Sequence, residues 1–365
     1  MKRYPLIFLI WIFPVTIFGQ RYISGRIIDA ENNEPIPGVS VFIANTTVGA
    51  ATGADGFYRL KLPGEGSYRL TVSHIGYQSV FSDIEPGKDS FETDIALKVN
   101  AIEEVTVAAN VQFRKRDIDL FWKTVLGKPP SKKTIYALNP EKVYYYYNFK
   151  TGILKVTCRE PLQIINNETG YHIQLIINYF THDYTTNTHT WEWERTFREL
   201  EPVNQIQKSI WEENRKKIYQ NSLTNFIKSL YHNILSENGF LLTYPKEIVK
   251  LDNYKDFSQN LNPPLIINST VDFKTFHIPS DSELMLICFG KTINQIDIRH
   301  VNLAHEGRLD WLSIGLFRNM LKTPQDPVQI FPDGTFKNPI QMTPCFFSVT
   351  LFGLDMALPA DYSPY

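Results

Sequence analysis

Three residues have types and a spacing that could hold a catalytic metal ion. His189 and Glu192 are separated as in the His-x-x-Glu pairs of hydrolytic zinc sites, and His305 lies downstream as a third ligand. Such a site needs side chains from one short turn and one distant segment to converge, with a fourth position left for water. Residues three apart in a β-strand point to opposite faces. Because the alternation around His189 and Glu192 predicts a strand, we expect no metal site, no catalytic residue and no cofactor.

The cysteines also lack a catalytic context. Cys158, Cys288 and Cys345 lie far apart in apolar or alternating runs, where a thiol usually behaves as a small buried hydrophobe. A nucleophilic thiol needs a nearby His and an electropositive setting, and the sequence indicates neither. Three widely spaced cysteines allow at most one disulfide and do not form the framework of a small secreted domain. We therefore predict that the chain is not an enzyme.

Length and composition predict a folded protein with more than one domain. The chain has 365 residues, of which 43% are hydrophobic and 21% charged, so it can bury two cores. The 19 Tyr and 24 Phe favour β-structure, because aromatic side chains suit a pleated surface. A formal net charge of −1 gives no support to nucleic-acid binding, which needs a basic surface. We expect a mainly β protein with no nucleic-acid partner.

Residues 1–19 have the pattern of a secretory signal peptide. Lys2 and Arg3 precede an apolar run that ends in a small residue before Gln20. A retained membrane anchor is the alternative, but Pro14 interrupts the run, and a spanning helix needs about 20 apolar residues. No cysteine follows the run for lipid attachment. We predict export to the periplasm or outer membrane, with no transmembrane span after cleavage.

The segment 20–99 predicts a β-sandwich of Greek-key type. Apolar residues alternate along short strands, and the clearest hairpin lies within residues 52–77. Its two strands are joined by a turn at residues 63–66. Asp55-Gly56 marks another tight turn, because glycine adopts a positive φ at no steric cost. Short strands at this spacing are typical of a sandwich.

A set of residues in this segment forms a recognisable pattern: Gly25, Ile27, Asp29, Pro35, Ile36, Pro37, Gly38, Val39, Val41, Thr52, Asp55, Gly56, Tyr58, Leu60, Tyr68, Leu70, Val72, Ser73, Ile75, Gly76 and Tyr77. The pattern resembles the carboxypeptidase regulatory-like (prealbumin-like) domain. The resemblance implies a seven-stranded immunoglobulin-like or prealbumin-like sandwich and an accessory role rather than peptidase activity. Such domains stand at the front of Bacteroidota envelope proteins, including TonB-dependent receptors, which implies a Gram-negative envelope location.

Residues 100–130 are interpreted as a linker with a short helix that ends at Gly127. Within it, Val105 and Val107 fall on one face of residues 101–110, a stretch that resembles the one preceding the plug of TonB-dependent receptors. An extended segment of this kind could add its backbone to a partner sheet, and an interdomain strand or plain linker is the alternative. The remaining chain is too short for a plug and a large closed barrel.

Residues 131–365 are predicted to form an α+β domain with an antiparallel sheet and one or two helices lying across it. Alternation is strongest at residues 143–198, and helical spacing replaces it at 202–239. Further strands are expected at 284–289, 296–301, 328–331 and 346–352. Residues 358–365 are expected to lie on the surface as a tail.

Trp191 and Trp193 are the predicted interaction residues of this domain, beside Val105 and Val107 in the linker. Neighbouring Trp side chains on an exposed strand can stack on sugar rings, which makes a glycan platform conceivable. We favour packing on the sheet face, because large aromatic groups dominate buried area.

Runs in the second half complete the pattern: 138–141, 160–162, 164–167, Gly170-Tyr171, Tyr219, Ser222, Phe226, Gly239-Phe240 and 358–362. They resemble the partner region in secreted Bacteroidota proteins that carry a carboxypeptidase-like regulatory domain, a family that implies no activity for particular residues. We predict a non-enzymatic exported envelope protein with an interaction or accessory role. Its partner would be another envelope protein, a peptide or a glycan. The alternatives are an envelope zinc metallocarboxypeptidase-like hydrolase and a TonB-linked transport accessory.

Overall fold

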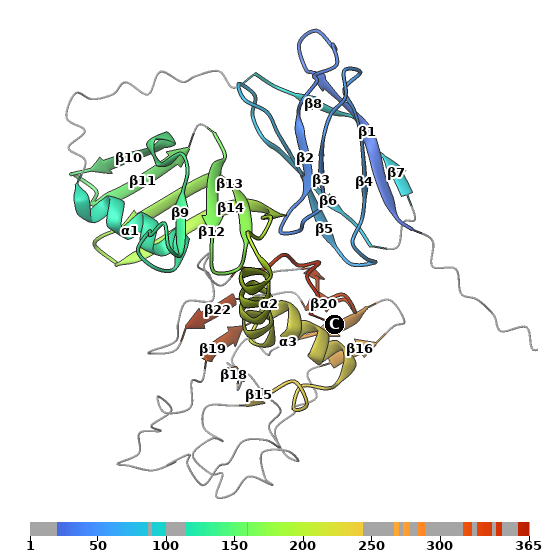
Figure 1. The fold of residues 1–365 in the computed structure, drawn as a ribbon, viewed down its shortest axis with the longest axis vertical. Coiled ribbons are helices and arrows are strands. Elements are labelled where there is room, and N and C mark those ends of the chain that lie inside the picture. The colour runs from blue at the N-terminus through green and yellow to red at the C-terminus, as the bar shows by residue number, and fades with distance from the viewer. Residues whose placement is uncertain are drawn as a thin grey trace, which may run out of the picture.

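The computed structural model describes residues 20–86, 90–99, 114–158, 160–243, 266–269, 273–277, 284–288, 317–322, 327–337, 341–344 and 357–364. Most of the regular structure in these residues is β-strand, as the sequence predicted. Figure 1 shows the N-terminal strands, in blue, gathered in one body, with the green sheet beside it and the yellow helices below. The predicted signal peptide and the stretch with Val105 and Val107 lie outside the described residues.

The N-terminal body is a sandwich of two four-stranded sheets. The first sheet contains β1 (Tyr22–Asp29), β4 (Phe57–Lys61), β7 (Ser90–Glu92) and β8 (Ile95–Leu97), and the second contains β2 (Ser40–Ile43), β3 (Gly49–Ala51), β5 (Tyr68–Ser73) and β6 (Val80–Ile84). Alternate side chains face inward, as in β4, where Tyr58 and Leu60 are buried between exposed neighbours. The predicted β-sandwich is confirmed. The predicted hairpin within residues 52–77 is wrong, because β4 pairs with β1 whereas β5 pairs with β2 and β6, so the turn at residues 63–66 crosses from one sheet to the other.

The sandwich has eight strands when β7 and β8 are counted separately, against the seven expected. Both pair in parallel with β1, β7 along its first half and β8 along its second. They are one edge strand interrupted at Thr93, whose amide donates to the Ser24 carbonyl. Gly25 lies at this interruption because a Cβ there would overlap the Thr93 carbonyl.

A six-stranded antiparallel sheet forms the centre of the second body. Its strands are β9 (Ile135–Ala137), β10 (Val143–Asn148), β11 (Ile153–Cys158), β12 (Leu162–Asn166), β13 (Tyr171–Asp183) and β14 (Thr188–Glu199). The order is β10-β11-β13-β12-β9, and β14 pairs with the other side of β13. The long β13 reads alternately buried and half-exposed along most of its length. Its inner face forms most of the second hydrophobic core.

The helix expected within the linker packs into this core. Helix α1 (Lys115–Leu126) buries Phe121, Trp122 and Val125 against the sheet. Phe121 meets the rings of Tyr145 and Phe180 edge to face, a favoured aromatic geometry. The helix ends at Gly127 in the left-handed conformation, as a C-terminal glycine allows. The second core therefore begins at α1.

Helices α2 (Gln205–Gln220) and α3 (Leu223–His232) follow β14, each with a side-chain cap at its start, from Asn204 and Ser222. Helix α2 packs on the turn that joins β12 to β13. The indole of Trp211 lies where a Cβ on Gly170 would overlap it, and its Nε1 donates to the Asn167 carbonyl. Arg215 is buried beside it and donates to the Thr169 carbonyl. Helix α2 therefore contacts the end of the sheet, whereas the sequence predicted helices lying across the sheet.

Helix α3 packs on a third, smaller core, and this core and the six-stranded sheet together make up the second body. It contributes Phe226 and Ile227, which meet strands β15 (Phe240–Thr243), β17 (Lys274–Phe276) and β20 (Val328–Ile330). The remaining strands are β16 (Ile266–Ser269), β18 (Leu284–Cys288), β19 (Phe317–Lys322), β21 (Phe336–Lys337) and β22 (Gln341–Pro344), in two four-stranded sheets ordered β16-β17-β20-β21 and β15-β18-β19-β22. The strands expected at 296–301 and 346–352 lie outside the described residues.

The expectation of a surface tail at 358–365 is wrong for its first half. Ala357 and Pro359 are buried, and Leu358 packs against the second core. The Ala360 amide donates to the Asn45 carbonyl at 2.7 Å, so the segment lies between the sandwich and the sheet. A long-range backbone contact, invisible to local patterns, places it there.

Candidate functional site

The two candidate metal ligands that the structure describes, His189 and Glu192, do not converge. Both His189 and Glu192 lie in β14, so the predicted extended backbone is confirmed and the two side chains face opposite sides of the sheet. His189 stacks on Trp191, whereas Glu192 is exposed opposite Tyr179. His305 lies outside the described residues. Where the structure describes the chain, no group of three or more His, Cys, Asp or Glu side chains is arranged to hold a metal ion.

Trp191 and Trp193 form an aromatic ladder with His189 along β14. The two indole centroids lie 5.2 Å apart at an angle of 24°, and the His189 ring lies 5.1 Å from Trp191 at 30°. Rings in this arrangement cover one another's faces, and both indoles pack against the second core. A sugar ring stacks on an open aromatic face, and the contacts within the ladder leave less open face for it.

Two imidazoles at the end of the ladder stay neutral at neutral pH. His182 is buried across from His189, and its Nδ1 has no hydrogen-bond partner among the described residues. Burial lowers the pKa of both, and for His189 the proximity of His182 adds to this. Cys158 is a free thiol in β11 whose pKa burial raises to about 12. The thiolate that nucleophilic chemistry requires is therefore disfavoured.

A cleft of about 550 Å³ lies where the sandwich meets the second body. Residues from the sandwich, from β14, from the start of α3, from the β21 hairpin and from the tail line it. They are Ala44, Asn45, Ser67, Tyr68, Arg69, Asp83, Glu85, Glu194, Arg195, Leu223, Thr224, Gly334, Thr335, Phe336, Lys337, Leu358 and Ala360. The volume is that of a small-molecule site.

Main-chain hydrogen bonds form one wall of the cleft. The loop between β2 and β3 turns through Asn45 in the left-handed conformation, which asparagine tolerates. The Asn45 amide donates to the Arg195 carbonyl at 2.6 Å, and the Phe197 amide donates to the Thr46 carbonyl at 3.0 Å. The loop thus extends the outer edge of β14. Thr47 then donates from its amide to the Asp361 carboxylate in the tail at 3.0 Å.

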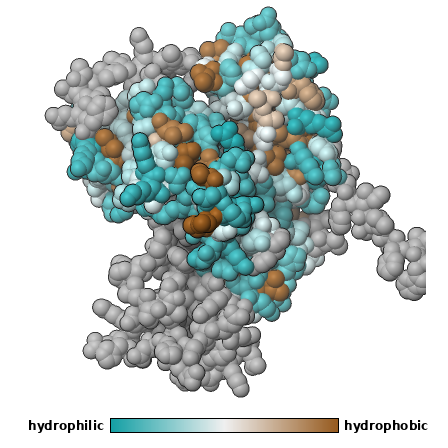
Figure 2. All heavy atoms as spheres, viewed as in Figure 1, coloured by the Kyte–Doolittle hydropathy of each residue, from teal (hydrophilic) through white to brown (hydrophobic). Residues whose placement is uncertain are grey.

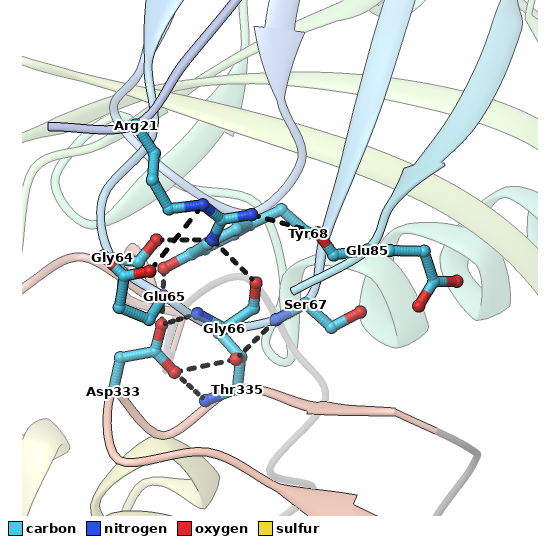
Figure 3. A network of polar contacts seen from close by, with 9 residues as sticks. All are labelled: Arg21, Gly64, Glu65, Gly66, Ser67, Tyr68, Glu85, Asp333 and Thr335. Atoms are coloured by element: carbon cyan, nitrogen blue, oxygen red, sulfur yellow. Dashed lines mark hydrogen bonds and ion pairs between the residues drawn. The ribbon is translucent and has the colours of Figure 1, made fainter. Parts of the chain in front are cut away.

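A second contact, drawn in Figure 3, joins the turn before β5 to the β20–β21 hairpin. The Asp333 carboxylate accepts from the Gly66 amide at 3.0 Å and from the Tyr68 hydroxyl at 2.6 Å. The Thr335 hydroxyl oxygen accepts from the Ser67 amide at 3.1 Å. A Cβ on Gly66 would overlap that hydroxyl and lie 2.5 and 2.6 Å from the two Asp333 oxygens. Only glycine allows this approach.

Arg21 braces the sandwich side of the same contact. It is buried and donates to the Gly64 carbonyl at 2.9 Å and to the Glu85 carbonyl at 3.0 Å. Glu85 in turn accepts from Lys337 of the hairpin at 2.7 Å. Backbone and charged groups on both sides therefore hold the two bodies together.

Two ion pairs of the cleft share Arg69. Arg69 pairs with Asp83 at 2.8 Å and with Glu194 at 3.1 Å. Glu194 is only 6% exposed, and burial raises its pKa although Arg69 acts in the opposite direction. Burial lowers the pKa of Arg195, whose Nε donates to the Asn45 side chain at 2.8 Å. Partly desolvated charges in a cleft are a mark of functional sites.

Comparison with known families gives a match for the front of the chain. Residues 23–107 match the model of the family described as CarboxypepD_reg-like domain. The sandwich is a CarboxypepD_reg-like domain. The resemblance of the front segment to this domain, seen in the sequence, is thereby confirmed. Comparison with curated proteins gave no significant match.

Solved structures similar to parts of the chain share little sequence with it. A cohesin–X-dockerin complex from Acetivibrio cellulolyticus is 22% identical over 20% of this chain and 51% of its own, with a TM-score of 0.18. The Bacillus anthracis TIE protein is 12% identical over 50% of this chain and 31% of its own, with a TM-score of 0.19. A DUF3823 family protein from Bacteroides uniformis is 9% identical over 50% of this chain and 100% of its own, with a TM-score of 0.17. At these scores the likenesses carry no argument. The matches span about half of the length of the first of these proteins and less than half of the second.

Sequence reasoning missed the residues that join the CarboxypepD_reg-like domain to the second body. Glu194 and Arg195 lie in a predicted strand, and Asp333 in a predicted turn, yet nothing local marks them as neighbours of Asn45 and Gly66. Gly66, in the turn before β5, was the one sequence signal for this contact, since a glycine suggests a close approach of another segment to the backbone. None of the helices that the structure describes is long and apolar enough to cross a membrane.

Proposed function

We propose that this chain is a non-enzymatic, exported cell-envelope protein with an interaction or accessory role. Its CarboxypepD_reg-like domain and second body act as one binding unit, and its partner is another envelope protein, a peptide or a glycan. The observation that carries the proposal is the cleft, whose lining comes from both bodies. Neither body alone would make it.

The contacts around the cleft support a fixed arrangement. Domains in one chain move freely relative to each other unless their interface holds them. Here the Asn45 loop extends β14 by main-chain bonds, and Asp333 accepts two charge-assisted bonds across the boundary. The buried tail segment adds a third connection at Thr47 and Asp361. Ligand sites lie preferentially at such domain boundaries.

The non-enzymatic part of the proposal rests on the geometry of the reactive groups. His189 and Glu192 diverge, and the pKa of Cys158 lies far above neutral. The alternative of a zinc hydrolase depends on His305, and a TonB-linked role depends on Val105 and Val107. All three lie outside the described residues. Metal analysis of the purified chain tests the first alternative, because a stoichiometric zinc ion would contradict the proposal.

Crosslinking in intact cells tests the binding unit. A photoreactive amino acid placed at Thr224, which lines the cleft, should capture a defined envelope component identified by mass spectrometry. The same group at Lys133, which is exposed and does not line the cleft, is the matched control. Equal capture from both positions, or none from Thr224, would contradict a partner site in the cleft. Loss of envelope fractionation on deleting residues 1–19 tests export.

A further inference from the structure

The cleft contains a hydrogen-bond acceptor and hydrogen-bond donors that are not bonded to other residues of the cleft. Glu194 accepts from Arg69 through Oε1, and no donor among the described residues reaches Oε2. Arg195, the next residue, donates through Nε to Asn45, and its two Nη groups have no acceptor among the described residues. Both residues line the cavity, and as neighbours in β14 they extend from opposite faces of the strand, so a ligand that reaches both spans its edge. None of these atoms is among the buried side-chain atoms that lack a partner, so water or a ligand in the cleft can bond to them.

The charges of the lining cancel. Arg69, Arg195 and Lys337 are balanced by Asp83, Glu85 and Glu194, so three positive and three negative side chains give a net charge of zero. A charged ligand would gain no net attraction and would pay for its own desolvation. A neutral ligand with many hydrogen-bonding groups matches the site better.

At the β14 edge of the cleft, the backbone groups that could bind an extended peptide are already hydrogen-bonded. An extended peptide binds a sheet edge chiefly through backbone hydrogen bonds. At this point of β14 the outward carbonyl of Arg195 and the outward amide of Phe197 already bond to the Asn45 loop. What remains is an array of side chains, with apolar surface from Leu223 and Phe336. A hydroxyl group both donates and accepts, so it can bond to a carboxylate and a guanidinium at once.

We propose that the cleft binds a neutral saccharide, with one hydroxyl donating to Glu194 and another accepting from Arg195. The inference rests on the proposed function and names the ligand class of that site. The apolar face of the sugar ring lies against Leu223 and Phe336 in this arrangement. The aromatic ladder of Trp191 and Trp193 takes no part, because neither residue lines the cleft.

The burial of Glu194 fits this role. Its raised pKa shows that the fold disfavours the charged form, so the carboxylate is retained at a cost to stability. Replacing it with glutamine keeps the shape and an acceptor for Arg69, and it removes the buried charge. A variant that folds at least as well as the original chain and yet loses ligand separates binding from folding.

Isothermal titration of the purified chain from residue 20 tests the proposal. The probes are maltose, cellobiose, xylobiose and N,N′-diacetylchitobiose, with the neutral tripeptide acetyl-Gly-Ser-Gly-amide for comparison. We expect at least one disaccharide to bind one to one with a Kd below about 1 mM, as a few good hydrogen bonds allow. Glu194→Gln and Arg195→Lys should each weaken it about tenfold or more. Glu192→Gln, on the same face of β14 but exposed, should leave affinity unchanged.

Other outcomes overturn the inference. No disaccharide binding at about 10 mM would do so, as would binding that Glu194→Gln leaves intact. Binding of the tripeptide alone would replace the ligand class. In each of these cases, crosslinking of a component to Thr224 in cells would still support the proposed binding unit. If both the titration and the crosslinking fail, the proposed function is contradicted as well. If Arg195→Lys does not fold, Glu194→Gln decides the matter.

Discussion

Replacing Asp333 with alanine should uncouple the CarboxypepD_reg-like domain from the second body. The carboxylate accepts two hydrogen bonds across the boundary, from the Gly66 amide and the Tyr68 hydroxyl. A hydrogen bond to a charged group contributes about 1.5–3 kcal/mol. Because Asp333 is half-buried, the lower figure applies, and loss of both bonds should cost about 3 kcal/mol. Tyr68→Phe removes one of them and should cost about 1.5 kcal/mol.

The chain provides its own probes for the measurement. Residues 20–99 contain no Trp, whereas Trp122, Trp191, Trp193 and Trp211 lie in the second body. Indole fluorescence therefore does not report on the sandwich, while far-ultraviolet circular dichroism reports on both bodies. In urea the two signals should change together in the original chain, and the dichroism should begin to change at lower urea in Asp333→Ala.

A double-mutant cycle isolates the bond between the two side chains. If Asp333→Ala already removes the contact to Tyr68, the double variant should be no less stable than Asp333→Ala, which gives a coupling energy of about 1.5 kcal/mol. Asp333→Asn keeps an acceptor and should lie between the original chain and Asp333→Ala. Strictly additive effects, or coincident transitions in Asp333→Ala, would refute the reasoning.

Three further outcomes are expected. Gly66→Ala should separate the two urea transitions as Asp333→Ala does, because its Cβ meets Asp333, while Glu65→Ala should not, because the Glu65 side chain of the same turn is exposed. Stability should fall as the pH rises from about 9 toward 12. Burial raises the pKa of Cys158 to about 12 from an ordinary 9.0. Burial and the hydrogen bond to Asp117 raise the pKa of Tyr184 to about 12 from 10.0, so both groups ionise at lower pH in the unfolded chain than in the folded one. A stability that does not change with pH in this range would contradict these shifts. Stability should also fall as the pH drops below 6.5, because the pKa of His182 is lowered on folding, and His182→Phe should flatten this acid limb in pH-dependent urea titrations.

Local patterns were enough to predict the sandwich and the course of β14. In β4 and β5 the inward residues Tyr58, Leu60 and Leu70 are buried as their alternation indicates. The strand from His189 to Phe197 is extended, which is what separates His189 from Glu192. These features depend on neighbours in sequence, and the period of two is strong enough to reveal them.

Helix α2 shows where such patterns mislead. The periodic Ile206 and Ile210 are 74% and 51% exposed, and Figure 2 shows brown atoms over α2 in a surface that is largely teal. The buried face instead carries Trp211, Arg215 and Tyr219. Trp211 and Arg215 pack on the turn before β13, where Gly170 leaves room for the indole. Contacts with a distant turn, not apolar period, set the orientation of the helix.

The cleft could not be predicted because its residues are far apart in sequence. Asn45 and Arg195 are joined by a loop added to a strand edge, and Gly66 meets Asp333 through a close backbone approach. Each partner looks ordinary in its own surroundings, as a loop asparagine, a strand arginine or a turn aspartate. Only the arrangement of three cores in space brings them together.

Hydrogen exchange at the Gly66 and Ser67 amides tests most directly whether the two bodies form one unit. Both amides lie in a turn of the sandwich, and their acceptors, Asp333 and Thr335, belong to the other body. If the bodies are docked, these amides should exchange far more slowly than in an open turn, and Asp333→Ala should release them while core amides of β5 stay protected. Rapid exchange at Gly66 and Ser67 in the original chain would contradict the docked arrangement and, with it, the cleft as a binding site.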